Sequence, residues 1–229
     1  MDPDKHDGSY EMMRETIKAY FSLVDFSIID YKDLNLVYLT VVGTWKQRVE
    51  LKQKTVRESH LSELEKERLC ALWNSCWEKA QAWQYSNNDP WGEGKPSIGM
   101  FGTGFNSFEK MTTSNDSQDF IRMCVDILPM KDDDLIYNRA ARTLSTGVKG
   151  MGAASASVVL HCLKPYTFPP MNGNMKSPNI FEVLGVPLEK RGSVETYVVN
   201  CRLIKAFRNQ NFSYKNYRIF DMAAYSLRQ

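Results

Sequence analysis

The sequence predicts a mainly α-helical fold, and two observations lead to that class. Apolar residues recur at helical spacing over much of the 229-residue chain. Residues that cap helices stand before several of these stretches, such as Ser62 with Glu65 and the acidic run Asp132–Asp134. The β-branched and aromatic run Leu34–Val42 is equally consistent with a short strand element near the N-terminus or with a buried helix.

The first half of the chain divides into helical stretches and one long loop. Residues 9–24 are predicted to be helical, residues 28–58 are ambiguous, and a helix follows the capping box at Ser62. Tyr85–Met111 is rich in Asn, Gly, Pro and Trp and predicts a loop. Its centre, Gly99–Phe105, lacks the GxxxxGK[ST] phosphate-binding pattern, so either a turn packed on the core or a substrate-lining loop is expected.

The second half reads as a series of helices joined by short breaks. The predicted helices span Ser117–Leu128, Asp132 to about Ser145, Ala153–Leu163, Ser193–Phe207 with Ser193 as cap, and Tyr214–Leu227. Phe168–Asn174 is irregular by composition. We expect residues 1–116 to form an N-terminal helical region and residues 117–229 a second helical region, packed together as one globular unit.

Composition limits the class of protein. The hydrophobic fraction of 43% and the charged fraction of 24% are ordinary for a globular chain, and a net charge of +2 is too small to indicate an anionic partner by itself. No stretch approaches the roughly 18 apolar residues of a membrane span, and the polar start differs from a secretory signal. We therefore expect no membrane partner and a cytoplasmic location, in a bacterial cytosol or nucleoid.

The cysteines suggest a reducing compartment. They are odd in number, scattered and without a CxxC pair: Cys70, Cys76, Cys124, Cys162 and Cys201. Disulfide frameworks, zinc sites and iron–sulfur clusters favour even or closely spaced cysteines. We expect buried thiols, no structural metal and no cofactor.

The run Val148-Lys149-Gly150-Met151-Gly152 predicts a tight turn between two helices. Its glycines permit positive φ angles and a close approach of the backbone to another group. The next helix opens with Ala153 and Ala154, and the first amides of a helix have no intrahelical partner. These N–H groups and the helix dipole favour a phosphate oxygen, while Met151 is expected to anchor the turn in the core.

Charge along the chain agrees with a phosphate site. Leu135–Phe181 contains no Asp or Glu, but it contains Arg139, Arg142, Lys149, Lys164 and Lys176. An acid-free, basic window around a glycine turn is typical of proteins that bind a nucleic-acid backbone. The expected contacts to double-stranded DNA come from Arg142, Val148, Lys149, Gly150, Gly152, Ala153, Ala154 and Lys176.

The pattern VKGMGAASASVVL resembles the helix–hairpin–helix of the base-excision DNA glycosylase superfamily, where an apolar-Pro-Gly-apolar-Gly turn precedes a helix rich in small residues. The resemblance covers about Leu135–Asn174, and the first hundred residues carry no matching motif. Hairpins of this type also occur in non-enzymatic DNA-binding proteins, so the motif indicates DNA contact more directly than catalysis.

The resemblance implies a site and a reaction. Asn172 lies where the family carries the aspartate that stabilises positive charge on the sugar and activates water, and an amide is uncharged and a poor base. Ala154 lies where bifunctional members carry a lysine nucleophile. The implied activity is a monofunctional DNA glycosylase that flips and excises a damaged or modified base, for example modified cytosine in phage DNA, and leaves an abasic site.

A flipped base needs aromatic and apolar walls. The candidates lie before and within the glycine-rich loop: Trp83, Tyr85, Trp91, Phe101 and Phe105. Each is also a natural core or loop anchor, since aromatic side chains dominate cores generally. His161 follows an apolar run without a nearby carboxylate in sequence, so it is expected to be a packed helix residue rather than a general base.

Three functions remain open at this point. The first is a DNA glycosylase, and the second is a non-catalytic reader of modified DNA, for example within a restriction system. The third is a structural or protein-interaction module whose glycine turn serves packing alone. The substitution of an amide at Asn172 favours the reader, and the acid-free window argues against the structural module.

Overall fold

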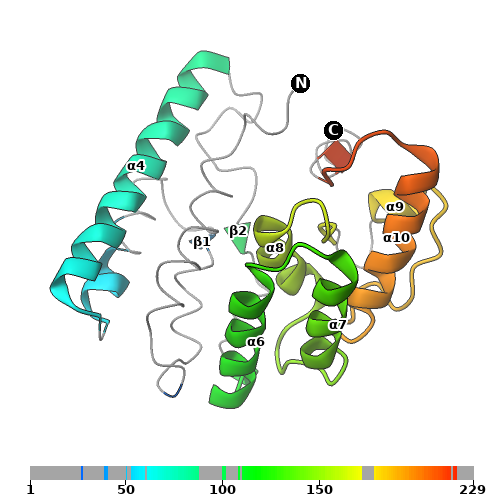
Figure 1. The fold of residues 1–229 in the computed structure, drawn as a ribbon, viewed down its shortest axis with the longest axis horizontal. Helices are drawn as coiled ribbons and strands as arrows, with labels where there is room; N and C mark the ends of the chain where they lie inside the picture. The colour runs from blue at the N-terminus through cyan, green and yellow to red at the C-terminus, as the bar shows by residue number, and fades with distance from the viewer. Residues whose placement is uncertain are drawn as a thin grey trace.

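The structure is a computed structural model that describes residues 27, 39–40, 50, 53–59, 61–87, 100–101, 108, 110–171, 178–217 and 219–220. Within these ranges the chain is mainly α-helical, as predicted. Helix α4 runs along one side of the molecule, and helices α6, α7, α8, α9 and α10 gather on the other (Figure 1). Among the described helices, none combines the length and apolar character that crossing a membrane requires.

Helix α4 spans Glu63–Asn87 and begins at the predicted capping box. The Glu65 N–H donates to the Ser62 hydroxyl at 3.4 Å, and the Ser62 N–H donates to the Glu65 carboxylate at 3.1 Å. The expectation that a loop begins at Tyr85 is wrong, because α4 continues through it to Asn87. No Gly or Pro precedes Pro90 in this stretch, so nothing local ends the helix earlier.

Two short strands pair in parallel, β1 (Leu39–Thr40) and β2 (Met100–Phe101). Leu39 lies opposite Met100, and Thr40 lies opposite Phe101. The ambiguous run Leu34–Val42 therefore contains a strand, and its other residues lie outside the described part. The helix predicted over residues 9–24 also lies outside it.

Helices α6 and α7 start at side-chain caps. Helix α6 spans Ser114–Ile127, three residues earlier than predicted, because the Thr113 side chain accepts the N–H of Asp116. Helix α7 spans Asp133–Leu144, and Asp132 caps it as predicted by accepting two backbone N–H groups at 2.9 Å. The two helices pack against each other, and each buries a large aromatic side chain, Phe120 in α6 and Tyr137 in α7.

Helix α8 spans Ala153–Leu163, with the predicted bounds. The sequence did not predict α9, a single turn over Ile180–Val183 with a capping box at Asn179. Helix α10 spans Tyr197–Asn211, so the expected start at Ser193 is wrong. Ser193 instead belongs to a turn in which its N–H donates to the Lys190 carbonyl at 2.7 Å.

The last predicted helix, Tyr214–Leu227, is described only in part. Residues 214–217 are not helical, and residues 219–220 are. The Tyr217 N–H donates to the carbonyl of Pro165, at 3.0 Å, rather than to a helical neighbour. The start predicted at Tyr214 is therefore wrong, because a long-range hydrogen bond takes the amide that a helix would use.

The segment after α8 crosses the core between α7 and α10. The ring of Phe168 lies edge-on to Tyr137, at a centroid distance of 5.7 Å, and stacks with Tyr197 at 6.1 Å. All three side chains are fully buried. This irregular segment is therefore an internal part of the helical unit that contains the glycine turn.

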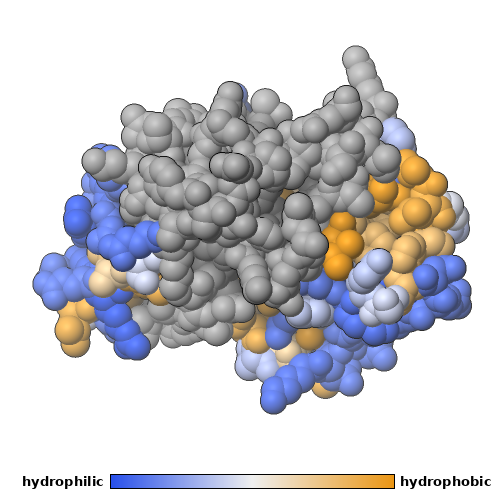
Figure 2. All heavy atoms as spheres, turned by 90° about the horizontal axis from the view of Figure 1, so that it is seen from above, coloured by the Kyte–Doolittle hydropathy of each residue, from blue (hydrophilic) through white to orange (hydrophobic). Residues whose placement is uncertain are grey.

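Apolar surface gathers at the end of the molecule where α9 and α10 lie (Figure 2). The exposed apolar side chains of this part of the chain include Val183, Leu184, Val199 and Tyr214. In the same view the surface of the neighbouring described residues is mostly polar. The glycine turn lies between α7 and α8 and is not part of either element.

Candidate nucleic-acid interface

The turn between α7 and α8 has the geometry that its glycines predict. The Met151 N–H donates to the Val148 carbonyl at 3.0 Å, and Gly150 has a φ of +79°. A four-residue turn with positive φ at its third position is a type II turn, which favours glycine there. Gly147, with a φ of +81°, donates its N–H to the Leu144 carbonyl and terminates α7.

Two apolar side chains hold this turn in the core. Met151 is 6% exposed and Val148 is 5% exposed, so the prediction that Met151 anchors the turn is confirmed. Between them Lys149 is exposed. Val148, expected among the DNA contacts, contributes core packing with its side chain, and only its backbone remains for a ligand.

The N-terminus of α8 retains free donors. Gly152 is the N-cap of α8 and makes no side-chain hydrogen bond. Its carbonyl accepts the N–H of Ala156, which is the first intrahelical bond. Among the described residues, the N–H groups of Ala154 and Ser155 have no acceptor. Two aligned amides at the positive end of a helix dipole form a site suited to an anion.

The third amide is already occupied. The Ala153 N–H donates to the carbonyl of Gly192 at 3.1 Å, which corrects the expectation that the Ala153 amide is available. The Ala153 side chain is also fully buried, whereas Ala154 is exposed. A Cβ atom on Gly152 would lie 3.1 Å from the same Gly192 oxygen, so glycine allows this close approach.

The Gly192 carbonyl belongs to a turn, Glu189–Ser193, that sequence reasoning missed. Buried Asn200 anchors it by accepting the Glu189 N–H and donating to the Glu189 carbonyl, both at 2.7 Å. Lys190 has a φ of +28°, unusual for a residue with a side chain. The hydrogen bonds from α10 hold this conformation, and no local motif in the sequence marks it.

The basic window is only partly a basic surface. Arg139 binds Asp126 at 2.7 Å and also donates to the Thr143 hydroxyl. Lys164 donates to the carbonyls of Leu128 and Met130, at 2.8 and 2.6 Å, and so closes the C-terminal end of α6. Arg139 and Lys164 therefore stabilise the fold, and the five basic residues of the window do not all contribute to a basic surface around the turn.

Arg142 and Lys149 are the cations of the window that remain exposed beside the turn. Arg142 lies in the last turn of α7, and Lys149 lies at the tip of the hairpin. Within the described ranges neither has an ion-pair partner. Lys176, the remaining expected contact, lies outside the described residues.

A carboxylate from outside the window lies against the turn. A Cβ atom on Gly147 would lie 3.0 Å from the Oε1 of Glu195. The Ser193 hydroxyl donates to this carboxylate and holds the pKa of Glu195 below its usual range, so the group is charged at neutral pH. No acidic residue lies near the turn in the sequence, but the Glu195 carboxylate lies near it in the structure.

The expected base-pocket residues are placed only by their backbones. Trp83 and Tyr85 lie in the last turns of α4, and Phe101 lies in β2. Trp91 and Phe105 lie outside the described residues, as does Asn172. The described part of the chain thus contains three of these six residues, on two different elements, and the expected base pocket stays a prediction.

His161 is a packed helix residue, as predicted. Its side chain is fully buried in α8, and burial lowers its pKa to about 4. A neutral imidazole at working pH must carry its proton on Nδ1, because that atom lies 2.7 Å from the Phe168 carbonyl oxygen. The ring supports the backbone and is not placed as a general base.

No group of three or more His, Cys, Asp or Glu side chains suited to a metal ion occurs among the described residues. In comparisons with protein families, curated proteins and solved structures, no match to the chain was found.

Proposed function

We propose that this protein binds duplex DNA by holding the sugar–phosphate backbone at the turn between α7 and α8. The observation that carries the proposal is the pair of amides at Ala154 and Ser155, which have no acceptor among the described residues. They stand at the start of an 11-residue helix, where the dipole adds to their attraction for an anion.

The surroundings of these amides support the same ligand. Gly150 and Gly152 present bare backbone, and the buried side chains of Val148 and Met151 keep the turn rigid. Lys149 and Arg142 supply mobile positive charge at the rim. A rigid donor pair with two flexible cations fits a phosphate of a polymer, whose neighbouring phosphates can reach the cations.

Excision of a damaged or modified base is the second part of the proposal. It rests on the resemblance of the hairpin and the following segment to DNA glycosylases. Ala154 has no amine that could attack the sugar, so the reaction would be hydrolysis of the N-glycosidic bond to leave an abasic site. The substrate class is a duplex with one modified or damaged base, such as modified cytosine.

A reader of modified DNA is the alternative, and one residue favours it. Asn172 stands at the position of the family's catalytic aspartate, and an amide neither carries the charge nor accepts the proton that hydrolysis requires. A protein that only recognises modified DNA needs the hairpin to bind the backbone and a pocket to bind the base, and it needs no catalytic carboxylate.

A panel of duplexes separates the two functions. Each duplex carries one modified base: 5-methylcytosine, 5-hydroxymethylcytosine, uracil, 8-oxoguanine or an alkylated purine. Alkali treatment after incubation cleaves the strand at abasic sites and reveals excision. Excision of one base supports the glycosylase, whereas selective tight binding without strand cleavage supports the reader.

The variant Asn172→Asp tests the same two functions by changing the protein instead of the DNA. Activity gained on the duplex that the wild type binds best would show that a carboxylate completes the site. Absence of both excision and selectivity across the panel, with backbone binding retained, would contradict the second part of the proposal and leave the first intact.

A further inference from the structure

Five consecutive backbone carbonyls of the segment after α8 each have their own hydrogen-bond donor. We call residues 165–171 the link. The donors, from Pro165 to Pro169 in order, are the Tyr217 N–H (3.0 Å), Arg208 Nη1 (2.7 Å), the Tyr137 hydroxyl (2.7 Å), His161 Nδ1 (2.7 Å) and the Tyr197 hydroxyl (2.8 Å). They come from α7, α8, α10 and the segment after α10.

The end of the link is tied to the first turns of α8. The Met171 N–H donates to the Ser157 hydroxyl at 2.9 Å, and that hydroxyl donates to the Ala154 carbonyl at 3.0 Å. Ala154 carries one of the two amides without an acceptor. The link therefore ends beside the proposed phosphate site, two hydrogen bonds away from it.

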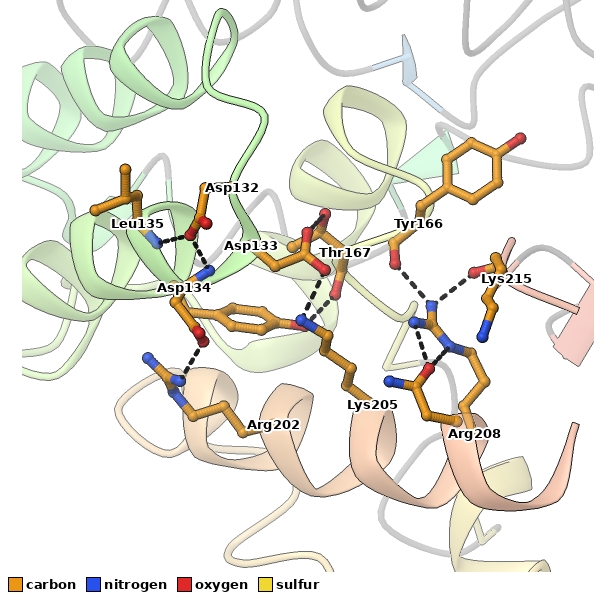
Figure 3. Close-up of polar contacts among 12 residues, drawn as sticks. Asp132, Asp133, Asp134, Leu135, Tyr166, Thr167, Arg202, Lys205, Arg208 and Lys215 are labelled. Carbon is orange, nitrogen blue, oxygen red and sulfur yellow. Dashed lines mark hydrogen bonds and ion pairs between the residues drawn. The ribbon is translucent and has the colours of Figure 1, made fainter. Parts of the chain in front are cut away.

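These donors are buried. Tyr137, Tyr197 and His161 are fully buried, and Arg208 is 3% exposed. Burial raises the pKa of both tyrosines, so their hydroxyls stay protonated and keep donating at any working pH. The guanidinium of Arg208 lies between the carbonyls of Tyr166 and Lys215 (Figure 3).

A second set of contacts ties α7 and α10 around the link. The Thr167 hydroxyl donates to the Asp133 carboxylate at 2.6 Å, and Lys205 Nζ lies 2.8 Å from the same carboxylate (Figure 3). Arg202 pairs with Asp134 at 3.0 Å one turn away along α10. The position of the link is thus defined by side chains from both helices as well as by its own backbone bonds.

Connecting segments ordinarily run over the surface, where water satisfies their carbonyls. Here each carbonyl instead accepts a hydrogen bond from its own buried donor, and these bonds stabilise one course of the backbone. Several independent donors hold a backbone more accurately than packing alone. Recognition sites need such support, since contacts must be held to within about 0.5 Å.

We propose that Tyr137, Tyr197 and Arg208 are positioning residues for base recognition, because they fix the link and so fix where the chain after Met171 begins beside the α8 N-terminus. This inference rests on the proposed function. It predicts a separation of effects, since the hairpin alone contacts the backbone. Loosening the link lowers selectivity for the altered nucleotide and leaves affinity for ordinary duplex unchanged.

The test removes single hydroxyl groups. Tyr197→Phe and Tyr137→Phe each delete one donor to the link and keep the ring. Tyr217→Phe is the matched control, because its buried hydroxyl has no hydrogen-bond partner among the described residues, and its link contact is made by the backbone N–H. Circular dichroism verifies that each variant is folded at the assay temperature.

Binding is measured on three duplexes of one sequence. The first is unmodified, the second carries one tetrahydrofuran abasic-site analogue, and the third carries one 5-hydroxymethylcytosine. The analogue resembles the product of excision whatever the base, and the third duplex serves the reader alternative. The quantity compared is the ratio of affinities for an altered and the unmodified duplex, which partial unfolding does not change.

The expected result is a fall of roughly tenfold in that ratio for Tyr197→Phe and Tyr137→Phe, equivalent to about 1.4 kcal/mol, with Tyr217→Phe unchanged. Affinity for the unmodified duplex stays within about twofold of wild type in all three. An unchanged ratio in both link variants, or equal losses on every duplex, would overturn the positioning role. A wild type without preference for either altered duplex would overturn base recognition itself, while the unmodified duplex still reports backbone binding.

Discussion

The carboxylate of Glu195 lies against the first glycine of the turn between α7 and α8. A Cβ atom on Gly147 would lie only 3.0 Å from its Oε1. The Ser193 hydroxyl holds the carboxylate there, and the hydrogen bond lowers its pKa. A negative charge therefore stands beside a site that we propose for phosphate, and it should weaken binding.

Glu195→Gln is expected to strengthen binding to an unmodified duplex. The glutamine keeps the shape and can still accept the Ser193 hydroxyl, but it removes the charge. Because the group is exposed, we expect roughly a two- to fivefold gain at low salt, shrinking as salt rises. Fluorescence anisotropy of a labelled duplex measures this gain.

The matched control for Glu195 is Glu67→Gln, an exposed carboxylate on α4. It removes the same charge at a distance from the turn and should leave affinity unchanged. Equal affinities for wild type and Glu195→Gln would place the DNA away from this carboxylate.

Gly147→Ala and Gly185→Ala separate the effect of backbone strain, which both variants have, from the effect of a contact with Glu195, which only the first has. Both glycines have positive φ, +81° and +87°, so alanine at either position is strained by about 1–2 kcal/mol. Nothing lies within 4 Å of a Cβ on Gly185, whereas one on Gly147 meets the end of the flexible Glu195 side chain. Similar losses in the free energy of unfolding are expected, measured by urea denaturation.

DNA affinity separates the two glycine variants. Gly147→Ala displaces the Glu195 carboxylate at the turn and should change affinity for duplex, and Gly185→Ala should not. A change caused by Gly185→Ala would mean that general destabilisation, and not the turn, governs the assay.

His161 makes stability depend on pH. Burial lowers its pKa in the folded protein to about 4, below the usual value of 6.5, so the unfolded chain binds a proton more readily. The stability of the neutral form is therefore fully present above about pH 6.5 and declines as pH falls towards 4. Between pH 7.5 and pH 5 the loss from this residue is about 2 kcal/mol.

His161→Asn isolates that contribution, since its amide can still donate to the Phe168 carbonyl but does not titrate. We expect a lower stability than wild type at pH 7.5 and a smaller loss between pH 7.5 and pH 5. Keeping the measurement above pH 5 avoids most carboxylate titration. Parallel pH profiles for wild type and variant would show that His161 is not buried in this way.

Helix bounds around the turn were predictable because their signals are local. Asp132 caps α7 with its own side chain, and Gly147 supplies the positive φ that ends it. Pro165, which cannot donate a backbone hydrogen bond, follows the last residues of α8. Each of these effects acts within a few residues, so a local sequence pattern is enough to predict it.

Other features depend on residues far apart in the chain. Ser193 resembles a helix cap, yet its hydroxyl donates to Glu195 and its N–H donates to Lys190, so α10 begins at Tyr197. The hydrogen bond from the Ala153 N–H to the Gly192 carbonyl also joins residues far apart in the chain, so a local sequence pattern cannot predict it.

Charge along the chain proved an incomplete guide to charge in space. Arg139 and Lys164 are used within the fold, one by Asp126 and the other by backbone carbonyls. Glu195 enters the acid-free neighbourhood from outside the window. Arg142 and Lys149 stay exposed beside the turn, and the proposal predicts that they face a phosphate backbone.

The salt dependence of duplex binding by wild type, Lys149→Ala and Lys131→Ala tests the proposed DNA contact most directly. Lys131 is exposed just before the N-terminus of α7, whereas Lys149 follows its C-terminus; this 12-residue helix is roughly 18 Å long, so Lys131 is the matched control. The proposal predicts that Lys149→Ala weakens binding and reduces the slope of log affinity against log salt by about one, while Lys131→Ala matches wild type. Absence of duplex binding, or one slope shared by all three proteins, would contradict it.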